Sequence, residues 1–257
     1  MARGKSKKAK KYLFEYNLLF INILSFIILI AVMLLTYFIE LNISDGFLEN
    51  YGLFLLNNAD SSSLDYKIIA MMILIIIAMA FWLVLHEIIH GVFYRLSGAK
   101  KDAISYGVVL EKGILYCKCS DYVTKSNVLI SVVAPFLLIG VVTYIIGMVF
   151  NLGWLVFLSI LNICGAAGDL AMFFFFIRRD KDFKFKELED STTFCLETTE
   201  DLIGKKFMAV KLKKVIANEK EVKEKKNKLI TVTKASWVFI IVIIIALFIS
   251  LGTVLFG

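Results

Sequence analysis

Long apolar runs alternate with shorter polar stretches along this chain. Five such runs lie at about residues 12–41, 67–96, 128–150, 154–177 and 235–256. Each run is long enough to cross the roughly 30 Å hydrocarbon core of a bilayer as a helix. The pattern therefore predicts an all-α polytopic membrane protein with about five transmembrane helices.

The polar stretches predict how these helices are oriented. Residues 1–12 carry six Lys or Arg residues and no acid, whereas the loop at 42–66 carries acids and no basic residue. Because cytoplasmic loops hold an excess of Lys and Arg, we expect a cytoplasmic N-terminus. Five crossings of the cell membrane would then leave the C-terminus external.

This pattern divides the chain into four regions. They are a basic tail with the first helix and an external loop (1–66), a three-helix membrane core (67–177), a charged cytoplasmic segment (178–234) and a C-terminal transmembrane helix (235–257). Within the charged segment, the Lys/Glu-rich stretch 211–228 is expected to form a solvated helix.

Two local signals interrupt the helical pattern of the core. Residues 99–127 alternate between apolar and polar positions around a turn at Glu111-Lys112-Gly113, which predicts a small membrane-associated β-hairpin. Pro135 lies inside the third apolar run. Because proline has no backbone N–H, it should free a carbonyl and kink that helix.

Composition agrees with a membrane protein. Hydrophobic residues make up 59% of the 257 positions and mean hydropathy is +0.79. The net charge of +7 gathers in the N-terminal tail and the segment after Arg178. It therefore indicates topology and contact with the lipid bilayer, and we expect no nucleic-acid partner. The four cysteines fit no disulfide framework.

The only two histidines lie in one pentapeptide, His86-Glu87-Ile88-Ile89-His90, inside the second apolar run. On a helix this HExxH spacing places both imidazoles on one face, one turn apart, with the glutamate beside them. That arrangement is typical of two zinc ligands and a general base. A polar cluster at membrane depth is costly and usually functional. The alternative to metal binding is a buried pair of histidines with a structural role.

Catalytic zinc usually has three protein ligands and a water, so a third ligand is needed. Asp169 is the one acid in the middle of the fourth apolar run. The histidines lie six to ten residues before Leu96 and Asp169 lies eight before Ile177, which gives matching depths of roughly 9–15 Å and about 12 Å. Asp169 is therefore the expected third ligand.

Two further residues of the fourth run are candidates. Cys164 is the competing third ligand, although a thiolate favours a structural site. Asn162 lies two turns before Asp169 on the same helix face and could bind the substrate backbone or an oxyanion. Pairing of helices through its amide is an equally good explanation.

This pattern resembles the site-2 protease type of intramembrane zinc metalloprotease, in which HExxH on one transmembrane helix is completed by an aspartate on a later one. More closely, the chain resembles the family of small prokaryotic membrane proteins described as putative zincin peptidases. The resemblance covers roughly residues 67–200 and rests on three stretches: Leu85–Gly91, Ala134-Pro135-Phe136 and Asn162–Asp169.

The resemblance implies an intramembrane zinc metalloendopeptidase with one Zn²⁺ per chain. His86, His90 and Asp169 would hold the metal, and Glu87 would serve as general base toward a membrane-protein substrate. A non-proteolytic membrane metal-binding or scaffold protein remains the alternative, and Glu87 distinguishes the two because metal binding alone does not need it. The substrate and the oligomeric state are not predicted.

Overall fold

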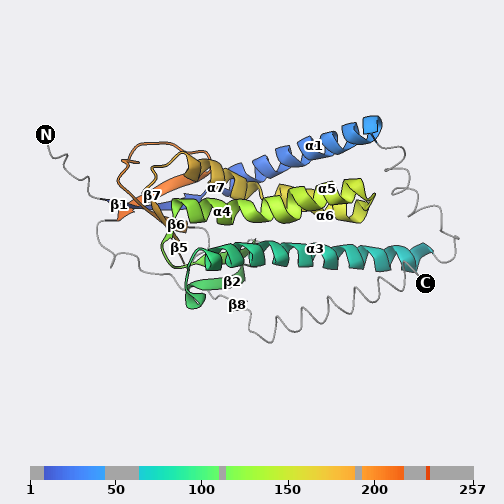
Figure 1. Cartoon of the computed structure of the whole chain (residues 1–257), viewed down its shortest axis with the longest axis horizontal. Coiled ribbons are helices and arrows are strands. Elements are labelled where there is room, and N and C mark those ends of the chain that lie inside the picture. The colour runs from blue at the N-terminus through green and yellow to red at the C-terminus, as the bar shows by residue number, and fades with distance from the viewer. Residues whose placement is uncertain (1–8, 44–63, 110–113, 189–192, 217–229, 232–257) are drawn as a thin grey trace.

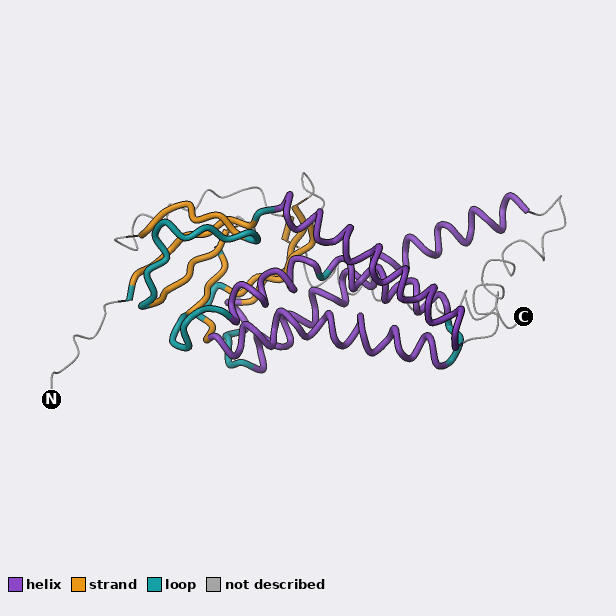
Figure 2. Tube along the Cα trace, turned by 90° about the horizontal axis from the view of Figure 1, so that it is seen from above, coloured by secondary structure: helices purple, strands orange, loops and turns teal. Residues whose placement is uncertain are grey.

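The computed structural model describes residues 9–43, 64–109, 114–188, 193–216 and 230–231. Within these ranges the long helices run side by side along one axis, and the strands gather toward one end of the bundle (Figure 1; Figure 2). The molecule therefore has an elongated helical part and a smaller sheet-bearing end.

Among the described residues, three helices are long and apolar enough to cross a membrane, at Leu18–Ile39, Ile73–Leu96 and Lys125–Val149. A fourth crossing exists if the pair Gly153–Gly165 and Ala167–Ile177, bent by 46°, forms one span. The helices are α1 (Leu18–Ile43), α3 (Leu64–Leu96), α4 (Lys125–Pro135), the π-helical η3 (Phe136–Val142), α5 (Thr143–Val149), α6 (Gly153–Gly165) and α7 (Ala167–Ile177).

The expectation of an all-α protein is wrong, because eight strands in two sheets accompany the described helices. A five-stranded antiparallel sheet has the order β4-β5-β6-β1-β7, and a three-stranded sheet has the order β3-β2-β8. The strands are β1 (Lys10–Tyr16), β2 (Ile104–Val109), β3 (Ile114–Cys119), β4 (Val123–Thr124), β5 (Lys184–Glu187), β6 (Thr193–Thr198), β7 (Val210–Ile216) and β8 (Ile230–Thr231).

The start of the first apolar run is a strand rather than the beginning of a transmembrane helix. In β1, Tyr12 and Phe14 are fully buried, whereas Leu13 and Glu15 on the other face are less so. This alternation is the period-2 pattern of a strand with one face in a core. The helix α1 begins only at Leu18.

The charged segment after Arg178, whose part at 183–215 could be expected to pack as a small element, supplies most of the five-stranded sheet. Phe183, Phe185 and Phe194 are buried and pack against Phe176 at the end of α7. Such clusters of aromatic rings bury large areas and gain further from edge-on and offset contacts. The sheet is therefore packed directly onto the end of the helical bundle.

The expected Lys/Glu-rich helix at 211–228 is also wrong where the structure describes it, because its first residues belong to β7 (Val210–Ile216). The rest of that stretch, most of the loop at 42–66 and the fifth expected crossing at 235–256 lie outside the described residues.

The hairpin predicted within 99–127 is confirmed. Strands β2 and β3 pair antiparallel from Ile104↔Cys119 to Val109↔Ile114, and the pair lies against α3 (Figure 1). The contact is close at Gly91, where an added Cβ would stand 1.8 Å from the hydroxyl oxygen of Tyr106. Any larger residue after the HExxH pentapeptide would therefore have to displace the Tyr106 side chain.

Candidate metal centre

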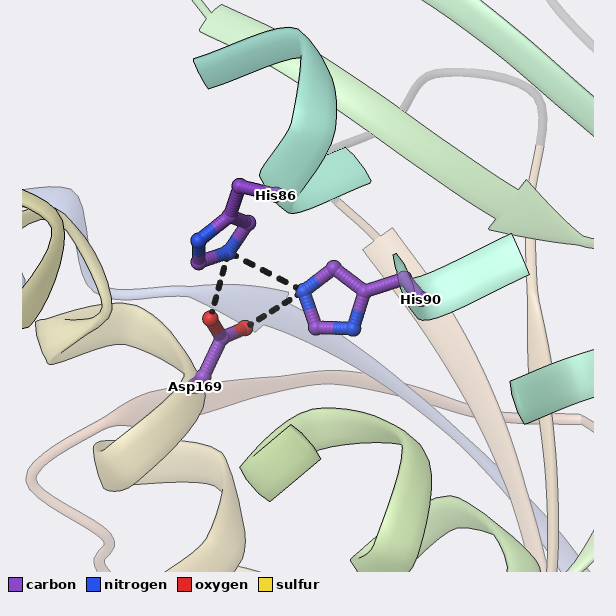
Figure 3. Close-up of side chains that lie close together, drawn as sticks. All are labelled: His86, His90 and Asp169. Carbon is purple, nitrogen blue, oxygen red and sulfur yellow. Dashed lines mark hydrogen bonds and ion pairs between the residues drawn. The ribbon is translucent and has the colours of Figure 1, made fainter. Parts of the chain in front are cut away.

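The two histidines of α3 meet Asp169 of α7 in the interior of the bundle (Figure 3). His86 and His90 are buried, and the two Nε2 atoms lie 3.2 Å apart. Asp169 Oδ2 lies 2.9 Å from Nε2 of His86, and Asp169 Oδ1 lies 3.4 Å from Nε2 of His90. Two imidazole nitrogens and one carboxylate therefore lie close together.

These separations fit a tetrahedral zinc site. With metal–ligand bonds of about 2.0–2.1 Å, tetrahedral geometry separates neighbouring ligand atoms by roughly 3.3–3.4 Å. The two Nε2 atoms, 3.2 Å apart, lie close to that range, and the contacts from the rings to the carboxylate are 2.9 Å to Oδ2 and 3.4 Å to Oδ1. The chemistry also fits, since two imidazoles and one carboxylate leave the fourth position open, as catalytic zinc requires.

Hydrogen bonds to the far sides of the rings indicate which nitrogens carry protons. His90 Nδ1 lies 2.9 Å from the carbonyl oxygen of Ser131, which can only accept, so Nδ1 donates. His86 Nδ1 lies 2.9 Å from Asn162 Oδ1 and donates to it. The Nε2 lone pairs of neutral rings would then face each other and a carboxylate. A cation satisfies that group of three acceptors.

A break between two helices aims Asp169 at α3. Helix α6 ends at Gly165 and α7 begins at Ala167, with a bend of 46° between them. Ala166 and Ala167 at the break are fully buried. Because Asp169 lies in the first turn of α7, its carboxylate also benefits from the positive end of the helix dipole.

Glu87 lies close to both the hairpin and the two imidazoles. It interacts electrostatically with both histidines, and its carboxylate is near the backbone of Cys117 in β3. It is not one of the three residues whose ligand atoms converge. Glu87 is thus next to the site, beside the first histidine in the chain, where the HExxH motif places its glutamate.

The sequence did not point to Glu187, which reaches the same region from β5. Its Oε2 accepts a hydrogen bond of 2.9 Å from the backbone N–H of Cys119 in β3. Burial raises the pKa of this carboxyl to about 7, while the Cys119 bond acts in the opposite direction. Glu187 reaches this region because β5 of the five-stranded sheet lies against β3 of the three-stranded sheet. No motif in the sequence indicates that contact.

The other candidates occupy different places. Cys164 is buried on α6 and is not part of the converging group among the described residues. Asn162 is buried beside His86, and its own Nδ2 donates to the carbonyl oxygen of Pro135 over 3.2 Å. The structure thus brings together both histidines, Asp169 and Asn162, and leaves Cys164 apart.

Together these features define a protein with apolar helices suited to a membrane and, between them, a group of three side chains that could hold a metal ion. Residues 79–183 match the model of a protein family described as "Putative zincin peptidase". The matched segment contains the HExxH pentapeptide and Asp169. None of the curated proteins or solved structures matches the chain. The family match supports a metallopeptidase, for which zinc is the implied metal.

Proposed function

We propose that this protein is an intramembrane zinc metalloprotease that hydrolyses peptide bonds within or near transmembrane segments of membrane proteins. The observation that carries the proposal is the convergence of His86, His90 and Asp169 from two helices of an apolar bundle. A site of this kind is reached most directly by a substrate that is itself in the bilayer. We infer an activity of the site-2 protease type.

Each residue has a distinct role in the proposed reaction. His86, His90 and Asp169 would hold one Zn²⁺ per chain. The bound metal supplies a water whose pKa falls to about 7 and polarises the substrate carbonyl. Glu87 would take up the proton of that water and pass it to the leaving amine.

The edge of β3 is a suitable place for the substrate backbone. Among the described strands, the order β3-β2-β8 leaves β3 at an edge of its sheet. The N–H group of Cys119 is directed away from β2, because it donates to Glu187, and Cys117 has the same strand parity. An unwound substrate segment could add to this edge as a strand and bring a carbonyl beside Glu87.

Replacing Glu87 with glutamine tests the proposal. The variant keeps the shape of the side chain but cannot accept a proton. We expect zinc content to stay at one per chain, while cleavage of a panel of fluorescent single-span peptides in liposomes falls by about 10²-fold or more. The matched control is Glu197→Gln on β6.

Two outcomes would contradict the proposal. Undiminished cleavage by Glu87→Gln would exclude the glutamate as general base. Zinc binding without cleavage of any peptide by the wild-type protein would favour the alternative, a non-proteolytic metal-binding or scaffold protein.

A further inference from the structure

The helix formed by α4, η3 and α5, here called the broken helix, lies beside the metal centre. It presents a row of backbone carbonyls to side chains of its neighbours. The carbonyl oxygens of Ser131, Pro135 and Ile139, spaced four residues apart, each accept a side-chain hydrogen bond. Ser131 accepts from Nδ1 of His90 over 2.9 Å, Pro135 from Nδ2 of Asn162 over 3.2 Å, and Ile139 from Nε1 of Trp82 over 3.2 Å.

The donors on α3 are spaced in the same way. Trp82, His86 and His90 are four residues apart and therefore lie along one face of that helix. The two outer residues donate directly to the broken helix. The middle one, His86, donates to Asn162 Oδ1. Asn162 Nδ2 in turn donates to the carbonyl oxygen of Pro135. Both metal-binding histidines are thus tied through Nδ1 to the same segment.

The sequence of the broken helix explains why it can accept these bonds. Pro135 has no N–H, so the carbonyl of Ser131 loses its ordinary helical partner. The π-helical segment η3 follows at Phe136–Val142, and such segments displace the regular bonding pattern. At Gly140 an added Cβ would lie 3.2 Å from Asn162 Nδ2, so glycine allows Asn162 to come this close.

We propose that Asn162 is a positioning residue of the metal centre: it fixes the tautomer and ring orientation of His86, as the Ser131 carbonyl freed by Pro135 does for His90. The inference deepens the proposed function and rests on metal binding at this site. Both polar ends of the Asn162 amide are already engaged. This role therefore differs from the substrate contact that the sequence suggested.

Zinc affinity, measured by competition with a chelator, tests the role directly. Groups that orient metal-binding histidines typically contribute about 10–100-fold to metal affinity. We expect Asn162→Leu to lose that factor and to alter the absorption spectrum of the Co²⁺-substituted protein. Asn162→Asp keeps an acceptor for His86 and should bind zinc at least as tightly as the wild type.

Trp82→Phe is the matched control, because it removes the outer hydrogen bond of the same row without touching a metal ligand. It should lower thermal stability and leave zinc affinity unchanged. Equal zinc affinity in Asn162→Leu and Trp82→Phe would overturn the inference. If Asn162→Leu does not fold, weaker zinc binding by Asn162→Asp would overturn it instead.

The same measurement separates this inference from the proposed function. A wild-type protein without zinc would refute the metal centre itself. A wild-type protein that binds zinc, together with an Asn162→Leu variant that binds it equally well, would refute only the positioning role.

Discussion

At the scale of single residues, the candidate site joins two imidazoles of α3 to a carboxylate of α7. Helical periodicity alone places His86 and His90 on one face, and equal depth in two apolar runs selects Asp169 from a distant part of the chain. The contacts of Asn162 were not predictable, because they depend on a carbonyl that becomes available only where α4 gives way to η3.

Asp169 carries the clearest expectation at this scale. Asp169→Ala should lower zinc affinity by more than about 100-fold, because changing only the groups that orient metal ligands already costs about 10–100-fold. Metal analysis of the purified protein measures this, with the exposed Asp102→Ala as the control. Equal zinc in Asp169→Ala and wild type would redirect attention to Cys164.

Glu187 predicts a pH dependence of stability. Its pKa rises from an ordinary 4.5 to about 7 on folding, so the folded state holds the proton more tightly than the unfolded state. This contribution is fully present below about pH 4.5 and is lost as the pH rises to about 7. The melting temperature of the metal-free protein should therefore fall as the pH rises across that window. The melting temperature of the Glu187→Gln variant should fall less. Parallel curves for the two proteins would contradict the assignment.

At the scale of elements, the sequence predicted the hairpin but not the five-stranded sheet. The hairpin is local, with alternating strands joined by a polar turn. The larger sheet is assembled from β1, hidden at the start of an apolar run, from the short β4, and from β5, β6 and β7, which lie in a charged segment. Its strands are distant in the sequence, so a local pattern can suggest that residues 183–215 pack together but cannot indicate which strands pair.

The edge of β3 gives a prediction at the scale of elements. Leu115 has the same strand parity as Cys117 and Cys119, so its N–H also points away from β2. Leu115→Pro should remove that donor without breaking a bond to β2, and should slow cleavage while zinc stays bound. Leu115→Ala, which retains the N–H, is the control. Equal cleavage rates in the two variants would rule out strand addition at this edge.

At the scale of the whole molecule, basic residues concentrate where the sheets lie. Flanking the described helices at that end are Arg95, Lys100, Lys101, Lys125, Arg178 and Arg179. Cytoplasmic ends of membrane helices carry this excess. We therefore expect the sheet-bearing end, and with it the nearer side of the metal centre, to face the cytoplasm.

Thiol labelling in intact cells tests this orientation. The wild-type protein is a good background because its four cysteines are all buried. A membrane-impermeant maleimide should label Asn151→Cys, at the opposite end of the bundle, without lysis. It should label Lys181→Cys only after lysis. The reverse result would invert the topology.

The central position of β1 has a consequence for how the molecule forms. This first strand of the chain lies between β6 and β7, which come from residues 193–216. Its edges therefore remain without these partners until that later part of the chain has been synthesised. Both histidines and Asp169 leave the ribosome earlier. The metal ligands thus exist in the nascent protein before the sheet that joins the start of α1 to the end of α7 can close, so closure of the sheet is a late step of assembly.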